Sequence, residues 1–200
     1  MNKTAFKLLA GAIFLTLTAR VAEAHVFIDD TSGFAHGFWH PLSGLDHILA
    51  MVTVGIYAAQ LGGRAIWLVP ASFVCLMALG GALGVAGISV SFAELGIGLS
   101  VVVLGATVAM SLQVGPAIAM ALVGFFAFFH GHAHGMEMPE SVASLTYGTG
   151  FLTATALLHA LGIGGGLSLG GQSRARGRTL IRCLGGAASL AGVGLLAGIL

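Results

Sequence analysis

Long apolar stretches fill most of this chain, and they restrict its fold more than any other feature of the sequence. Each stretch runs for about 18 residues or more, which is enough for a helix to cross roughly 30 Å of hydrocarbon. Only 8% of the residues are charged, whereas 57% are hydrophobic. This balance is typical of integral membrane proteins and not of soluble domains. We therefore predict an all-α integral membrane protein.

Six apolar stretches follow the N-terminal region, and we expect each to form one transmembrane helix of a single bundle. Pro41 suits the first turn of the first helix, where the missing N–H of a proline needs no partner. Ser91 and Glu94 form a capping-box pattern at the start of the third helix. The predicted helices cover residues 41–61, 65–87, 91–113, 115 to the histidines at 130–134, 139–169 and 178–200.

Glycine pairs and isolated cysteines give further constraints on the bundle. Three glycine pairs have the small-xxx-small spacing of closely packed membrane helices. They are Gly80/Gly84, Gly162/Gly166 and Gly194/Gly198. Cys75 and Cys183 lie in separate apolar stretches, so we expect two small core residues and neither a disulfide nor a cysteine metal site. The net charge of +1 and the lack of a basic patch argue against a nucleic-acid partner.

The first 24 residues have the pattern of a secretory signal peptide. Lys3 and Lys7 form a short basic region, an apolar region follows, and residues 22–24 (Ala-Glu-Ala) end in a small-x-small site. Cleavage after Ala24 would leave residues 25–200 as one permease domain. His25 would then offer both its α-amine and its imidazole to a metal ion. An uncleaved membrane anchor is the alternative, because Arg20 interrupts the stretch before the site.

Positive charges indicate the orientation in the membrane. With a cleaved signal peptide the mature N-terminus is periplasmic, and every Lys or Arg after residue 24 then falls on the cytoplasmic side, in agreement with the positive-inside rule. These residues are Arg64, Arg174, Arg176, Arg178 and Arg182. Most acidic and histidine residues fall on the opposite side. We expect a multi-pass protein of the bacterial inner membrane whose histidine-rich face looks outward.

A histidine cluster ends the fourth apolar stretch. His130, His132 and His134 alternate with small residues, and Glu137 follows them. Imidazole and carboxylate groups together suit Ni²⁺, Co²⁺ or Zn²⁺, so the cluster predicts a metal site at the membrane boundary. His130 and His134 would share one face if the helix continued through them, but the glycines at 131 and 135 make that continuation doubtful. A polar loop that is merely rich in histidine is the alternative.

A second group of candidate ligands lies in the first predicted helix. His40 and His47 are close to two turns apart, so they would project from nearly the same face, with Asp46 beside them. Asp46 and His47 would lie about 8 to 10 Å from the outer end of this helix. A carboxylate at that depth must be paired, hydrated or bound to a cation. Alternatively, Asp46 bonds a neighbouring helix and fixes the His47 tautomer. His36 could extend the site outward or be a solvated surface residue.

His159 stands alone near the middle of the fifth stretch. A buried imidazole in hydrocarbon is expensive without a partner, so an intramembrane histidine is a candidate for ion or proton handling. A hydrogen bond between helices is the simpler explanation. The complete set of predicted ligands is His25, His36, His40, Asp46, His47, His130, His132, His134, Glu137 and His159.

Two long motifs resemble the HupE/UreJ family of hydrogenase and urease accessory proteins. They are His40-Pro41-x-x-Gly44-x-Asp46-His47-x-x-Ala50-Met51 and Phe129-His130-Gly131-His132-Ala133-His134-Gly135-x-Glu137-x-Pro139. The resemblance implies a six-helix secondary permease that carries Ni²⁺ across the inner membrane for nickel enzymes. The first motif is also similar to, but one residue longer than, the signature of the larger nickel/cobalt permeases, so Co²⁺ remains an alternative substrate.

The predicted function is secondary transport of nickel into the cytoplasm, without a permanently bound cofactor. No nucleotide-binding loop is present in the sequence, so transport would be facilitated or gradient-driven. The expected partners are Ni²⁺, the lipid bilayer and nickel-enzyme maturation proteins; the oligomeric state is open. Two other classes compete with this prediction: a membrane metalloenzyme of the di-iron type, and a non-transporting receptor that passes nickel to a partner.

Overall fold

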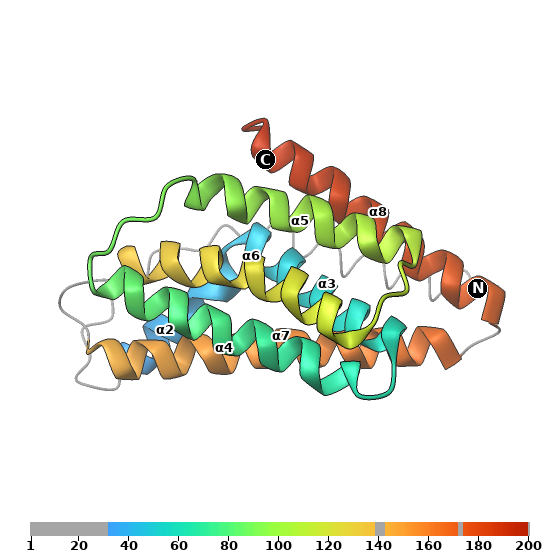
Figure 1. The fold of residues 1–200 in the computed structure, drawn as a ribbon, viewed down its shortest axis with the longest axis horizontal. Helices are drawn as coiled ribbons and strands as arrows, with labels where there is room; N and C mark the ends of the chain where they lie inside the picture. Colours follow the sequence, from blue (N-terminus) through green and yellow to red (C-terminus); the bar gives the residue numbers. More distant parts are fainter. Residues whose placement is uncertain (1–31, 139–142, 172–173, 200) are drawn as a thin grey trace.

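Seven α-helices form one bundle in the part of the chain that the computed structural model describes, residues 32–138, 143–171 and 174–199 (Figure 1). They are α2 (Ser32–Ser43), α3 (Leu45–Leu61), α4 (Ala65–Val85), α5 (Ala93–Met110), α6 (Pro116–Met136), α7 (Ser144–Gly171) and α8 (Arg174–Leu196). No strand occurs in these residues. The predicted all-α class is thus confirmed, whereas the predicted signal peptide and His25 lie outside the described residues.

Length and composition allow most of these helices to cross a membrane. Five of them, α4 to α8, are long and apolar enough, and the bent pair α2 and α3 passes the same test when taken together. The described residues therefore contain five candidate spans, or six if the bent pair counts as one. The expected number of six stays a prediction.

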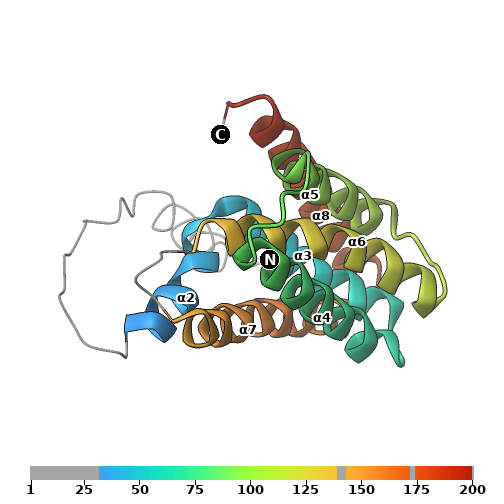
Figure 2. The same cartoon turned by 60° about the vertical axis from the view of Figure 1, so that its left-hand side comes forward.

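The first apolar stretch is not the single helix that we predicted to begin at Pro41. Helix α2 already runs through Pro41 and ends at Ser43, and α3 begins at Leu45 at an angle of 82°. Gly44 separates the two helices, and a Cβ atom at this position would lie only 2.7 Å from Asp46 Oδ1. Figure 2 shows the consequence: α2 turns away from α3 and lies beside α7.

Two helix ends also differ from the prediction. The capping box at Ser91 does not form, because α5 begins at Ala93 after Phe92, which has a φ of 65° and no side-chain cap bond. At its other end α5 stops at Met110, since Ser111 also takes a left-handed conformation. Capping patterns report local preference only, and here the tertiary arrangement of the connection prevails.

Close backbone contacts at glycine hold the central helices together. A Cβ at Gly80 would collide with the backbone of Phe128, so α4 and α6 touch along their main chains. A Cβ at Gly162 would likewise collide with Val52, which brings α7 onto α3. The first two predicted glycine pairs therefore lie in helix contacts. For the third pair, Gly194/Gly198, the predicted helix contact is wrong at Gly198. This residue follows α8 with a φ of 66°, and nothing lies near its Cβ position.

Charged residues separate toward the two ends of the bundle. Arg64 precedes α4 and Arg174 begins α8, and Figure 1 places both connections at the same end. Glu94, at the start of α5, and Glu137, after α6, lie at the opposite end. This separation agrees with the charge pattern that the sequence analysis used, and the orientation in the inner membrane remains a prediction.

Replacing Gly80 by alanine should destabilise the bundle, because the new methyl group would force α4 and α6 apart at a backbone contact. We expect a loss of about 1–3 kcal/mol. Gly164→Ala is the matched control, since nothing lies within 4 Å of its Cβ position and alanine favours the helix. Thermal unfolding of both purified variants in detergent measures the difference. Equal melting temperatures for the two would contradict the packing described above.

Candidate metal site

Three possible ligands from two helices converge at the acidic end of the bundle, and we name them the outer group: His40, His134 and Glu137. His40 Nε2 lies 2.9 Å from His134 Nδ1, which lies 3.1 Å from Glu137 Oε2. The third side of the triangle, from His40 Nε2 to Glu137 Oε2, measures 3.7 Å. Adjacent ligands of an ion with bonds of about 2.0–2.2 Å are separated by roughly 3 Å. The outer group therefore has the spacing of a partial coordination sphere.

Helix α6 places two of these ligands because it continues through its histidines. The glycines that made this continuation doubtful are accommodated by α4: a Cβ at Gly131 would collide with Met77, and one at Gly135 with Gly81. The helix therefore extends to Met136, and His130 and His134 share a face one turn apart. His132 points elsewhere, as the continued helix predicts.

His134 Nδ1 can make at most one full hydrogen bond within the outer group; otherwise its single hydrogen is shared between Glu137 Oε2 and the Nε2 lone pair of His40. His134 Nδ1 faces both His40 Nε2 and Glu137 Oε2, yet a neutral imidazole nitrogen carries either one hydrogen or one lone pair. If His134 Nδ1 donates to the carboxylate, it has no lone pair for an N–H of His40. If it accepts from His40, it has no hydrogen for Glu137. A cation between the three atoms would satisfy all of them at once.

Glu137 supplies the negative charge of the outer group. Its side chain is 53% exposed, and its backbone N–H bonds the Ala133 carbonyl oxygen at the end of α6. The hydrogen bond from His134 holds the pKa of the Glu137 carboxyl below its ordinary value, against the smaller opposing effect of partial burial. The group is therefore an ionised carboxylate at neutral and mildly acidic pH.

Two more imidazoles, which we name the inner pair, lie behind the outer group: His47 on α3 and His130 on α6. His47 Nδ1 donates to Asp46 Oδ1 over 3.0 Å, and His130 Nδ1 donates to the Phe126 carbonyl oxygen over 3.1 Å. Carboxylate and carbonyl oxygens only accept, so the hydrogens are fixed on Nδ1 and each Nε2 keeps its lone pair. Within the described residues both Nε2 atoms are buried without a partner. This is how histidine ligands are commonly prepared for a metal ion.

The inner pair and the outer group are in contact. The His47 ring centroid lies 4.1 Å from that of His134 and 5.0 Å from that of His130. The ring centroids of His40 and His134 are 4.7 Å apart. The prediction that His40 and His47 project from one face of one helix is wrong, because the break at Gly44 puts them on different helices. They nevertheless meet at His134, which the fold brings between them.

His159 lies deeper in the bundle. It is buried on α7, and within the described residues neither of its ring nitrogens has a hydrogen-bond partner. Phe73 of α4 stands between it and the inner pair, with its ring 5.9 Å from that of His130 and 4.9 Å from that of His159. A phenylalanine in an apolar helix carries no signal in the sequence, so sequence reasoning did not find Phe73.

The remaining predicted ligands lie apart from these groups. His36 is exposed on α2. His132 is buried, and its Nε2 donates to the Ile88 carbonyl oxygen over 2.6 Å, which ties α6 to the connection between α4 and α5. The structure thus gathers His40, Asp46, His47, His130, His134 and Glu137, and it does not bring His36 or His132 into that cluster.

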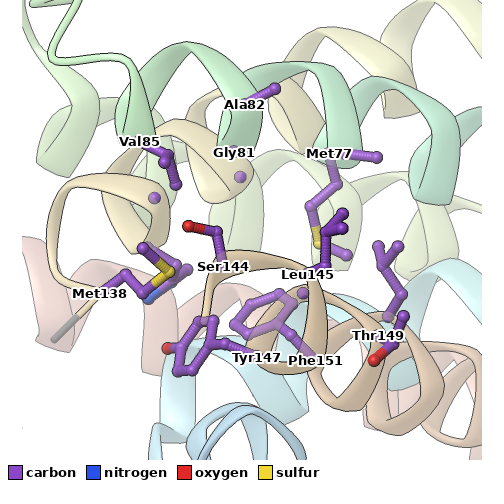
Figure 3. Close-up of a pocket in the computed structure, with 16 residues that line it drawn as sticks. Met77, Gly81, Ala82, Val85, Met138, Ser144, Leu145, Tyr147, Thr149 and Phe151 are labelled. Carbon is purple, nitrogen blue, oxygen red and sulfur yellow. The ribbon is translucent and has the colours of Figure 1, made fainter. Parts of the chain in front are cut away.

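A cavity of about 380 Å³ adjoins the outer group between α4, α6 and α7 (Figure 3). His134 and Tyr147 reach its wall, but most of the lining is apolar, including Met77, Val85 and Leu145. An ion would gain few ligands there. The cavity is therefore a lateral hollow beside the site and not part of its ligand set.

Comparison with known proteins gives one family. The sequence matches the family described as HupE / UreJ protein over residues 13–195. Protein HupE of Rhizobium leguminosarum bv. viciae is 46% identical over 178 residues, which cover 89% of this chain and 91% of that relative. No solved structure matches the chain significantly.

Replacing Glu137 by glutamine should weaken nickel binding, because the side chain keeps its shape but loses its charge. We expect the dissociation constant of the purified protein, measured by equilibrium dialysis with ⁶³Ni²⁺, to rise about tenfold or more. Binding by the unmodified protein should fall on acidification, since a protonated imidazole cannot bind a metal. His36→Ala serves as the control. Equal affinities of Glu137→Gln and the unmodified protein would remove Glu137 from the site.

Proposed function

Because this chain belongs to the HupE/UreJ family of hydrogenase and urease accessory proteins, as its two histidine motifs predicted, we propose that it carries Ni²⁺ across the bacterial inner membrane into the cytoplasm. The family consists of accessory and transport-type proteins and is not a known enzyme family. The imported nickel would serve the maturation of a hydrogenase or a urease. Nickel is the transported substrate in this proposal and not a resident cofactor.

A row of imidazole rings supports transport more directly than any other feature. It begins at the half-exposed outer group, continues through the inner pair with ring separations of 4.1 and 5.0 Å, and points past Phe73 toward His159. Each step offers nitrogen atoms without partners in the described residues. An ion passing along this row would exchange part of its water for imidazole at each stage.

Asp46 has a distinct role in this proposal. Its carboxylate is 29% exposed and bonds His47, so it supplies negative charge at the stage where the ion leaves the outer group. A cation moving into a low-dielectric bundle needs such a charge nearby. At the same time no stage has the four closed ligands of a structural site, and release remains possible.

Two alternatives use the same residues. A receptor that passes nickel to a partner would need only the outer group, which faces solvent at Glu137. A cobalt transporter would use the whole row, because imidazole and carboxylate ligands suit both ions. His36 and His132 lie outside the row, so the proposal gives them no ligand role; His25, outside the described residues, stays a predicted outer ligand.

Uptake of ⁶³Ni²⁺ by cells that express the chain tests the proposal. Asp46→Asn and His47→Ala should each lower uptake by roughly tenfold or more at equal protein level in the membrane, because they remove the charge or the lone pair behind the outer group. His36→Ala, an exposed histidine on α2, should retain normal uptake.

The possible outcomes separate the rival functions. Normal uptake by both Asp46→Asn and His47→Ala would refute the assigned row. If the unmodified protein is correctly inserted and binds nickel but supports no uptake, the receptor is the better description.

Competition between ions should reveal the substrate. We expect an excess of unlabelled Ni²⁺ to abolish ⁶³Ni²⁺ uptake, Co²⁺ to compete partly, and Zn²⁺ and Cu²⁺ to compete less. Stronger inhibition by Co²⁺ than by Ni²⁺ would favour the cobalt alternative. Measuring all ions at one free concentration in the same cells makes the comparison direct.

A further inference from the structure

We propose that the hydroxyl of Tyr147 bonds a water molecule held by the cation at the outer group, and that it thereby favours ions that keep much of their water. This inference rests on the proposed function and adds a residue that determines specificity. Tyr147 belongs to neither predicted ligand group. It is a positioning residue in this proposal, since a water molecule stands between it and the ion.

Tyr147 is fixed beside the outer group by both helices that it touches. It lies in the first turns of α7, and a Cβ at Gly37 of α2 would collide with its carbonyl group, so the two backbones are in contact. Its ring centroid lies 6.0 Å from that of His40 in an edge-on arrangement. Figure 3 shows the ring next to Phe151, and the two centroids are 6.2 Å apart. Phe151 in turn lies 5.2 Å from His134.

The hydroxyl group of Tyr147 lacks a partner. The residue is only 5% exposed, and within the described residues its buried oxygen makes no hydrogen bond. A buried hydroxyl without a partner costs free energy, typically about 1–3 kcal/mol in proteins. Phe151, one turn along the same helix, packs its ring without a hydroxyl. Packing does not account for the polar atom at Tyr147, and a polar partner would offset the cost of burying it.

The outer group, with its Glu137 carboxylate, lies next to Tyr147. His40 lies against the ring, and His134 and Tyr147 line the same cavity. An ion bound by His40, His134 and Glu137 still has positions filled by water. A metal-bound water is a strong hydrogen-bond donor, and a bridging water joins polar groups that are too far apart for a direct bond. The Tyr147 oxygen can accept that bond.

Water-mediated contact distinguishes ions by the number of waters that they keep. Zn²⁺ readily adopts a four-coordinate geometry and would keep one water beyond the three protein ligands. Ni²⁺ accepts more ligands and would keep additional waters, so it offers more donors to a hydroxyl placed at the edge of the site. Removing the hydroxyl should therefore weaken the binding of Ni²⁺ more than the binding of Zn²⁺.

Tyr147→Phe tests this inference, because it removes the hydroxyl and leaves the ring. In the purified full-length protein we expect the dissociation constant for ⁶³Ni²⁺ to rise about five- to tenfold and that for Zn²⁺ to change less than about twofold. Tyr57→Phe is the matched control. Tyr57 is the chain's other tyrosine and is also buried with an unpartnered hydroxyl in the described part of the chain, but it lies roughly 15 Å along α3 from His47. It should change neither constant.

Each outcome decides the inference. A larger loss for nickel than for zinc in Tyr147→Phe, with an unchanged melting temperature and no effect of Tyr57→Phe, supports it. Unchanged nickel binding, or equal losses for both ions, overturns it. The binding assay does not depend on transport. A wild-type chain that binds nickel without taking it up in cells would therefore contradict the proposed function, and the losses in Ni²⁺ and Zn²⁺ affinity in Tyr147→Phe would still decide the role of Tyr147.

Discussion

Backbone contact between α4 and α6 is the constraint on which the rest of the site depends. Glycines on both helices, Gly80 and Gly84 on one and Gly131 and Gly135 on the other, let the main chains touch where side chains would collide. Without that contact two glycines in one helical turn would favour an end to α6 at its histidines. With it the helix reaches Met136. The spacing of His130, His134 and Glu137 is thus set by packing on a neighbouring helix.

A second constraint acts on the hydrogens of the imidazoles. Asp46 and the Phe126 carbonyl oxygen accept hydrogen bonds from Nδ1 of His47 and of His130, respectively. The Nε2 atoms of both rings keep their lone pairs and are buried without partners in the described residues. The two hydrogen bonds that satisfy the Nδ1 atoms therefore leave the Nε2 atoms ready to bind a cation. The explanation of Asp46 as a structural partner of His47 and its explanation as part of an ion path are not rivals, because fixing the tautomer is what makes His47 a ligand.

Periodicity and motif spacing predicted the helical class and two of the three glycine contacts, since these follow from local geometry. They placed His130 and His134 on one face only if the helix continued, which the glycines at 131 and 135 left in doubt. The break between α2 and α3 was not predictable in this way. The proline at 41 favours a helix start, yet it lies inside α2, and the 82° bend falls at Gly44, which takes an extended conformation between the two helices. Phe73 and Tyr147 were missed for another reason: an aromatic residue in an apolar helix acquires a role only through what other helices bring beside it.

The bend at Gly44 also explains why the site has two stages instead of one. In a continuous helix His40 and His47 would lie about 10 Å apart along the axis and could not both reach one histidine. The bend places His40 on a separate helix, and His134 then lies within 4.7 Å of one ring and 4.1 Å of the other. His134 can belong to the outer group through Nδ1 in one tautomer, whereas in the other tautomer its Nε2, buried and without a partner in the described residues, would be available on the inner side. An imidazole that exchanges its hydrogen between Nε2 and Nδ1 could therefore serve the two stages in turn.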